Sequence, residues 1–278
     1  MVVFDAHCHV GKWGTWDIMG KYVTPFPYEY SEFPEFMEHY MNRYKPEYAV
    51  IVPHYLPDRF RTFELNHVVM DFVRKDERLI GGLWVNPSPD VYSISLEVLE
   101  SYPIPRIKVI KMSPDAWSNN LSPDPRTWDE RTRSFMDSVI DIAIKYHLVV
   151  HFHTGVNRSD PTNYQHFMEL YGNSGAAIQF VHMGNLAGGH FKFIPMFIEW
   201  LKLGYNAYCD ISLSRGFGPR WLISEMHRSN LSLERILFAS DEPWGDYPSE
   251  IAKIQNLRIS ENEMHNILFQ NAFNLYIN

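Results

Sequence analysis

One short apolar run of the sequence ends in two histidines: Val2-Val3-Phe4-Asp5-Ala6-His7-Cys8-His9. Its β-branched and aromatic residues favour a β-strand. Because the side chains of a strand alternate between two faces, His7 and His9 project toward the same point, where two imidazoles can share a metal ion. A His-x-His pair is weak evidence by itself, since about 0.6 such pairs are expected by chance in a chain this rich in histidine. Its position relative to the other runs therefore matters.

Seven similar runs follow, with helical patterns between them. The eight runs are Val2–His9, Tyr48–Tyr55, Leu79–Pro87, Arg106–Met112, Leu148–Gly155, Ala177–Gly184, Asn206–Ser212 and Arg235–Asp241. Short strands that alternate with helices are typical of βαβ units and a parallel sheet. The 278 residues are close to the roughly 250 of one closed eightfold barrel. We predict an α/β fold, a single (β/α)₈ TIM barrel that forms one domain over residues 1–278.

Two segments carry helix-start patterns, Thr127-Trp128-Asp129-Glu130 and Ser260-Glu261-Asn262-Glu263. Both match the capping box, in which a hydroxyl and a carboxylate satisfy free backbone N–H groups. We therefore predict amphipathic helices over Ser134–His147 and Asn262–Tyr276. Two long connections, Gly11–Glu35 and Ser113–Trp128, follow strand ends, on the side of a parallel barrel where active-site loops lie.

The composition restricts the partners. A net charge of −8 argues against nucleic-acid binding, which requires clustered Lys and Arg. No apolar run reaches the ~18 residues of a membrane span, and no leader pattern precedes Phe4. We expect a cytoplasmic protein that acts on a small-molecule substrate, binds neither membrane nor nucleic acid, and forms a homodimer, the commonest symmetric assembly.

Histidine and aspartate recur where later runs end, at His153, His182 and Asp241. In a parallel barrel all strand ends open onto one mouth, so these residues would surround a common point with His7 and His9. Nitrogen and carboxylate ligands of this kind suit Zn²⁺, Mn²⁺ or Fe²⁺.

These residue types suit metal-assisted hydrolysis. Neutral imidazoles hold the ion, which lowers the pKa of a bound water and polarises a carbonyl. Asp241 is the candidate base, and His182 either binds metal or stabilises the developing oxyanion. Lys111 ends an apolar strand and shares a face with inward residues. It is either carbamylated, bridging two metal ions, or an amine that binds substrate.

Further residues have both a structural and a functional interpretation. His54 could contact a substrate, and Arg215 could bind a carboxylate group of the substrate. Arg158 and Arg220 are weaker candidates for binding that carboxylate. His151 is expected to be a hydrogen-bonded core residue, and Asp210 with Ser212 form either a structural network or a binding site with Arg215. Four tryptophans could wall the pocket: Trp13, Trp16, Trp117 and Trp244.

Beyond the metal motifs, three segments carry a family resemblance: the helix opened by Asn66 that leads to Arg78–Pro87, Ile107–Pro114, and Ile267–Leu275 with Asn271-Ala272. With those motifs, nearly the whole chain resembles the amidohydrolase-related family, whose branch includes lactone and amide hydrolases and aminocarboxymuconate-semialdehyde decarboxylases. The resemblance implies a metal held by His7, His9, His153 and Asp241, with His182 near the attacking water. Glu242 and Ser113 depart from the family pattern, which affects the expected substrate more than the metal.

The sequence thus predicts a metal-dependent hydrolase that opens a small, carboxylate-bearing lactone, amide or ester. The cofactor expected is one or two divalent transition ions, with Zn²⁺ ahead of Mn²⁺ and Fe²⁺. One alternative is a metal-dependent decarboxylase of an unsaturated carboxylic acid. Another is a metal-binding barrel without turnover.

Overall fold

The computed structural model describes residues 1–13, 15–16, 19, 21–24, 26–54, 59–118, 120–185 and 187–278. Tyr55, the last residue of one predicted run, lies outside these ranges, as does the side chain of Trp16.

Eight parallel strands form one sheet, and each strand pairs with the next along the chain. They are β1 (Phe4–Val10), β4 (Tyr48–Pro53), β5 (Leu79–Trp84), β6 (Ile107–Met112), β7 (Val149–His153), β8 (Ala177–Val181), β9 (Ala207–Asp210) and β10 (Ile236–Leu237). Each predicted run coincides with one of them, so the (β/α)₈ barrel is confirmed. Several runs extend past their strand, because the polar residues that end them have already left the sheet. The extent of the domain over residues 1–278 stays a prediction.

The barrel closes between β1 and the segment after β10. The N–H of Ala6 donates to the carbonyl of Phe238 at 3.0 Å, and the N–H of Asp241 donates to the carbonyl of His7 at 2.9 Å. The N–H of His9 donates to the carbonyl of Glu242 at 2.7 Å. The two ends of the described sheet therefore meet along the residues that carry the predicted ligands.

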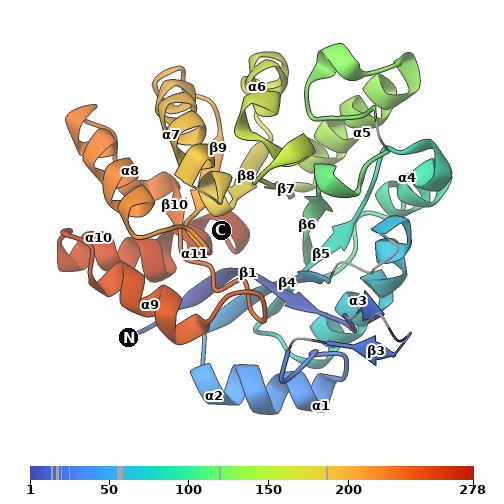
Figure 1. Cartoon of the computed structure of the whole chain (residues 1–278), viewed down its shortest axis with the longest axis horizontal. Helices are drawn as coiled ribbons and strands as arrows, with labels where there is room; N and C mark the ends of the chain where they lie inside the picture. The colour runs from blue at the N-terminus through green and yellow to red at the C-terminus, as the bar shows by residue number, and fades with distance from the viewer. Residues whose placement is uncertain are drawn as a thin grey trace.

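Helices surround the strands (Figure 1). They are α1 (Phe33–Phe36), α2 (Asn42–Tyr44), α3 (Asn66–Lys75), α4 (Tyr92–Glu100), α5 (Glu130–Tyr146), α6 (Gln165–Tyr171), α7 (Ala187–Lys202), α8 (Phe217–Arg228), α9 (Tyr247–Gln255), α10 (Glu261–His265) and α11 (Asn271–Tyr276). A short antiparallel pair, β2 (Thr15–Trp16) and β3 (Tyr22–Val23), lies in the first long connection. Among the described helices, none has the length and apolar character needed to cross a bilayer.

The apolar core has two parts. The larger one packs the outward faces of the strands against the helices. The smaller one includes Phe4, Val50, Val109 and Val149 from the strands, and Tyr276 of α11 packs against them. In Figure 1 α11 and the C-terminus project onto the middle of the ring of strands. The C-terminal helix therefore covers one end of the barrel interior.

The helix starts confirm one capping box and correct the other. Ser260 and Glu263 form the predicted reciprocal pair at the start of α10. The helix predicted from Thr127 is instead capped by Asp129, whose side chain accepts from the N–H of Thr132. Thr127 donates its hydroxyl to the carbonyl of Asp124 at 2.7 Å. Asp129 competes successfully because a carboxylate is as strong a cap as a hydroxyl and lies one residue before α5.

Candidate metal centre

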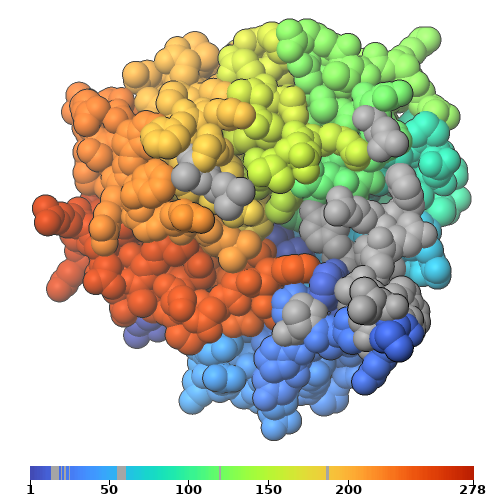
Figure 2. All heavy atoms as spheres, viewed as in Figure 1, coloured from blue at the N-terminus to red at the C-terminus, as the bar shows by residue number. Residues whose placement is uncertain are grey.

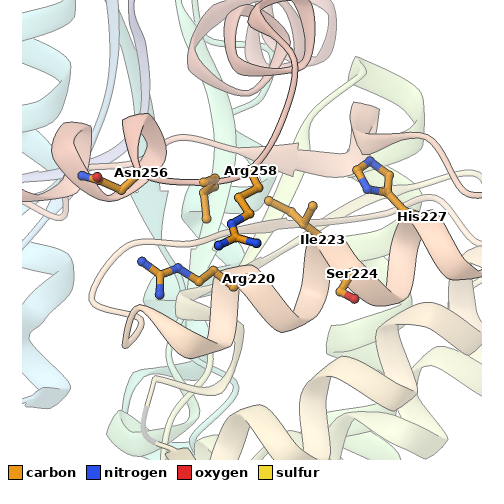
Figure 3. Close-up of a pocket in the computed structure, with 7 residues that line it drawn as sticks. Arg220, Ile223, Ser224, His227, Asn256 and Arg258 are labelled. Atoms are coloured by element: carbon orange, nitrogen blue, oxygen red, sulfur yellow. The ribbon is translucent and has the colours of Figure 1, made fainter.

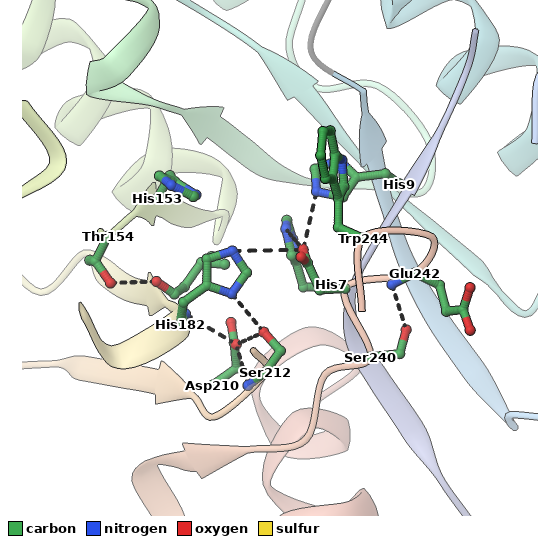
Figure 4. Close-up of polar contacts among 12 residues, drawn as sticks. His7, His9, His153, Thr154, His182, Asp210, Ser212, Ser240, Glu242 and Trp244 are labelled. Carbon is green, nitrogen blue, oxygen red and sulfur yellow. Dashed lines mark hydrogen bonds and ion pairs between the residues drawn. The ribbon is translucent and has the colours of Figure 1, made fainter. Parts of the chain in front are cut away.

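Two histidines of β1 and one aspartate beyond β10 form the centre of the candidate site; the two histidines are labelled in Figure 4. The Nε2 atoms of His7 and His9 each lie 3.2 Å from Oδ1 of Asp241. The rings of His7 and His9 are 4.7 Å apart and nearly perpendicular. All three residues are buried. The alternation of β1 side chains thus brings the two imidazoles to one carboxylate oxygen, as predicted.

The turn after β10 aims Asp241 at this point. Asp241 has a backbone φ of 55°, and His182, another site residue, has a φ of 72°. Such values are uncommon for residues other than glycine and cluster at functional sites. Gly245 closes the turn that begins at Asp241, because its N–H donates to the Asp241 carbonyl at 2.8 Å. A Cβ at Gly245 would meet the Ser240 carbonyl oxygen at 2.0 Å, so a larger residue would displace the turn.

The geometry fits a divalent metal better than a hydrogen-bonded cluster. Three buried atoms, Nδ1 and Nε2 of His7 and Oδ1 of Asp241, have no hydrogen-bond partner among the described residues. Burying such groups without partners is costly. Two ligands of an ion bound at about 2.0–2.2 Å lie roughly 3 Å from each other, close to the 3.2 Å seen here. Imidazole nitrogen with carboxylate oxygen is a donor set for Zn²⁺, Mn²⁺ or Fe²⁺.

His182 faces the same carboxylate from the turn after β8. Its Nε2 lies 3.7 Å from Asp241 Oδ1, and its Nδ1 lies 2.8 Å from the Ser212 hydroxyl. His7, His182 and Asp241 offer ligand atoms that all lie within 4.8 Å of one another. Burial, assisted by His153, Lys111 and His9, holds the pKa of His182 well below its usual value. It is therefore neutral at pH 7 and able to offer a lone pair.

His9 is oriented by the backbone of the neighbouring strand. Its Nδ1 lies 3.0 Å from the carbonyl oxygen of Pro53, which only accepts hydrogen bonds. The proton of neutral His9 is therefore on Nδ1, and Nε2 presents a lone pair toward Asp241. Metal-binding histidines are commonly oriented in this way.

His153, at the end of β7, lies farther from Asp241 than the β1 pair. Its ring centroid is 5.0 Å from that of His182, and its Nε2 lies 3.8 Å from Oδ2 of Asp115. The described residues bring His153 to the same cavity, but not into the compact group of His7, His182 and Asp241. Its role as a ligand stays a prediction.

A cavity of about 200 Å³ opens above this cluster. Its lining comes from the strands β1 and β7 and from the turns that follow β8, β9 and β10, and it is His9, His153, His182, Asn185, Leu213, Asp241 and Trp244. Figure 2 shows the N-terminal segments in blue meeting the orange segment around residues 240–250 on one face of the molecule. The sequence did not single out Asn185, Leu213 or Asp115, because turn residues without metal-binding spacing carry no pattern. Asp115 lies in the second long connection, Ser113–Trp128, which was predicted to lie on the active-site side of the barrel.

Aromatic rings pack around Trp244 at the rim of the cavity. The ring centroids of Trp13 and Phe26 each lie 4.8 Å from that of Trp244, and their ring planes are inclined to it by 75° and 81°. Trp244 donates from Nε1 to Nδ1 of His54 at 3.2 Å, and the ring of His54 stacks on His9 at 5.1 Å. We call Trp13, Phe26, His54 and Trp244 the aromatic wall. Trp117, also expected near the pocket, is fully buried and is not among the residues that line the cavity.

Lys111 is fully buried in β6. Among the described residues its Nζ has no hydrogen-bond partner. Burial lowers its pKa to about 8, while Asp241 and Asp210 oppose the shift. It is not among the residues that line the cavity, so a substrate contact would require a rearrangement.

The arginines predicted to bind a substrate carboxylate lie elsewhere in the described chain. Arg215 is exposed and is not part of the cavity lining. Arg158 donates to the carbonyl of Trp117 and so holds the second long loop. Arg220 lines a separate cavity of about 610 Å³ with Arg258 and His227, outside the barrel (Figure 3). That cavity contains none of the predicted metal ligands.

Comparison with known proteins agrees with this architecture. A family model described as amidohydrolase matches residues 4–276, and no curated protein matches the chain.

Three solved structures show similar folds. A probable 2-pyrone-4,6-dicarboxylic acid hydrolase from Acinetobacter baumannii has a TM-score of 0.65 at 14% identity, over 99% of each chain. An IDCase from Metarhizium anisopliae has a TM-score of 0.65 at 14% identity, over 99% of this chain and 97% of that one. A dihydroxybenzoic acid decarboxylase from Polaromonas sp. JS666, with bound manganese and the inhibitor 2-nitroresorcinol, has a TM-score of 0.61 at 16% identity, over 99% and 96%. At these identities the likeness establishes the fold.

Proposed function

The chain belongs to the amidohydrolase family, and on this basis we propose that it is a metal-dependent hydrolase that opens a small, carboxylate-bearing lactone, amide or ester. One observation carries the proposal. Three imidazole Nε2 atoms, of His7, His9 and His182, lie 3.2, 3.2 and 3.7 Å from Oδ1 of Asp241 beside an open cavity.

His7, His9, His153 and Asp241 would hold the ion. The imidazole and carboxylate donors support Zn²⁺, Mn²⁺ or Fe²⁺, and the manganese in the similar Polaromonas structure supports Mn²⁺ in particular. When bound, such an ion would lower the pKa of a coordinated water and polarise the substrate carbonyl.

The protein side chains supply the proton transfers. Asp241 lines the cavity and is the only carboxylate among its described lining residues, so it is the group placed to take a proton from the attacking water. After the tetrahedral carbon forms, the same carboxyl can return the proton to the leaving oxygen or nitrogen. Trp244 and Leu213 restrict the substrate to a small one, in keeping with the cavity of about 200 Å³.

A second candidate, decarboxylation of an unsaturated carboxylic acid, is favoured by the aromatic wall. The rings of Trp13, Phe26 and Trp244 lie within 5.2 Å of one another and provide flat surfaces against which a planar unsaturated acid can pack. In this reaction Asp241 would donate a proton to the carbon that loses CO₂. Two similar folds belong to decarboxylases of dihydroxybenzoic acids.

The experiment that tests the proposal uses metal-loaded protein and a panel of lactones, amides, esters and unsaturated acids. Hydrolysis of a lactone or ester releases a proton and hydrolysis of an amide releases an amine, in both cases without CO₂, whereas decarboxylation releases CO₂. Proton, amine and CO₂ release are measured on each compound. Proton or amine release that is lost in Asp241→Asn supports hydrolysis. If CO₂ alone appears, the second candidate replaces the first. Stoichiometric metal with no turnover on the whole panel would leave a metal-binding barrel.

A further inference from the structure

A continuous chain of buried polar groups runs from the candidate site to the C-terminal helix. It consists of His182, Ser212, Asp210, Gln179, Tyr276 and His151, each buried. Asp210 ends β9 and Gln179 lies in β8, while Tyr276 reaches the barrel interior from α11. Figure 4 shows the part of this chain nearest the site, with Ser212 between Asp210 and His182.

The direction of the hydrogen bonds on one side of Asp210 is fixed by backbone groups. Oδ1 of Asp210 accepts from the N–H groups of His182 and Ser212, each at 3.2 Å. Since a backbone N–H can only donate, Oδ1 is an acceptor, and the Ser212 hydroxyl donates to it at 2.5 Å. That hydroxyl has one proton. Ser212 Oγ must therefore accept from Nδ1 of His182, 2.8 Å away.

The other side of Asp210 follows from the orientation of the Gln179 amide. Oδ2 accepts from Nε2 of Gln179 at 3.0 Å, which turns the amide oxygen of Gln179 toward Tyr276. The Tyr276 hydroxyl donates to that oxygen. With its single proton used, the Tyr276 oxygen accepts from Nε2 of His151 at 2.5 Å. All hydrogen bonds of both arms thus point toward Asp210.

We propose that Asp210 is a positioning residue that fixes the tautomers of two histidines, with the proton of His182 on Nδ1 and that of His151 on Nε2. The inference about catalysis rests on the proposed function: His182 then presents the lone pair of Nε2 to Asp241 and the cavity. Neutral His182 accepts a proton or binds an ion there, and it does not donate a hydrogen bond to an oxyanion. This decides between the two roles that the sequence allowed for His182.

The two arms can be broken separately. Ser212→Ala removes the acceptor of His182 and leaves Gln179 and Tyr276 untouched. Asp210→Asn keeps an oxygen at the position that accepts the two N–H groups, but its amide now donates to Gln179. Gln179 must then flip and donate to Tyr276, which turns the Tyr276 proton toward His151. His151 should move its proton to Nδ1, whereas His182 should not change.

The test is ¹⁵N NMR of the imidazole nitrogens in the metal-free full chain at pH 8, where protonated and unprotonated ring nitrogens have distinct shifts. In the wild type we expect protonated Nδ1 for His182 and protonated Nε2 for His151. Ser212→Ala should alter the tautomer only of His182, and Asp210→Asn only that of His151. His9, held by Pro53, is the internal control that stays constant and shows that the variants are folded. Protonated Nε2 on wild-type His182, or unchanged tautomers in both variants, would overturn the proposal.

A kinetic arm separates this proposal from the proposed function. With any panel compound that turns over, Ser212→Ala should lower kcat by about 10- to 100-fold, as removal of groups that orient metal-site histidines commonly does, with KM changed less than about threefold. Ser212→Thr, which keeps the hydroxyl, should restore the tautomer and most of kcat. Correct tautomers without any turnover would contradict the proposed function alone; turnover with the wrong tautomers would contradict the positioning role alone.

Discussion

Two halves of the candidate site differ in how firmly the fold holds them. The buried half, His7, His9 and Asp241, is at most 3% exposed and is held by the backbone hydrogen bonds that close the barrel. In the open half, the side chains of His153 and Asp115 are 18% and 19% exposed, and Trp244 is 39% exposed. The buried half is thus built for a fixed ligand, whereas the open half can adapt to a substrate.

Metal content is the largest difference expected between the halves. His7→Ala/His9→Ala removes two of the nitrogens nearest Asp241, so we expect about one equivalent of metal in the wild type and none in this variant. His153→Ala should retain the metal and lose about tenfold in affinity, the lower end of what changes around metal sites cause. Plasma mass spectrometry and competition with a chelator measure both. Equal losses would remove the distinction, and two ions per chain would support a carbamylated Lys111.

Within the buried half, Asp241→Asn should separate chemistry from binding. The amide keeps the size of the side chain but cannot take a proton. We expect kcat to fall by about 10³-fold, within the range for a lost general base, while the protein keeps most of its metal. Steady-state kinetics on the active compound, alongside metal analysis of the same sample, would check this. Preserved activity would rule out Asp241 as the base.

Lys111 tests the electrostatics of the interior beside the buried half. Burial lowers its pKa from 10.5 to about 8, so between these values the unfolded chain binds more protons than the folded one. Stability must then rise with pH across this window, and the full penalty is present below pH 8. Relative to Lys111→Met, the metal-free wild type should gain about 3 kcal/mol in free energy of unfolding from pH 8 to 10.5. Urea titrations of both proteins measure this difference, and parallel pH curves would contradict it.

The smallest effect is expected in the open half. Trp244→Ala removes a ring at the rim of the cavity, and we expect KM to rise about tenfold, equivalent to about 1.4 kcal/mol of binding. Because Trp244 lies outside the compact ligand group, kcat should change less than threefold. Trp244→Phe keeps an aromatic face and serves as the matched control. A large fall in kcat with constant KM would place Trp244 in the chemistry and not in binding.

The sequence was sufficient to predict the barrel, because eight short apolar strands that alternate with helices can form few other parallel sheets. It also grouped His7, His9, His182 and Asp241, since strand ends of a parallel barrel share one mouth. The start of α5 was mispredicted because two neighbouring residues, Thr127 and Asp129, can each cap a helix, and only the packed structure selects between them.

The polar chain through Asp210 shows where sequence analysis stops. Asp210 and Ser212 were predicted to form either a structural network or a binding site with Arg215, but the other members of the network could not be identified. Tyr276 lies on a helix far along the chain, and its spacing resembles that of any buried aromatic residue. Likewise, Arg215 follows Ser212 closely in sequence, yet the turn after β9 leaves it exposed.

Barrel closure has a consequence for biosynthesis. His7 and His9 leave the ribosome more than two hundred residues before Asp241, whose N–H bonds to His7. During translation the β1 edge that the segment after β10 will cover has no partner, and unpaired strand edges favour association between chains. Ribosome stalling or premature termination before residue 238 would therefore leave a nascent chain with an unpaired, association-prone strand edge and an incomplete set of metal ligands. The edge is protected and the site is assembled only once the segment that follows β10 has been synthesised.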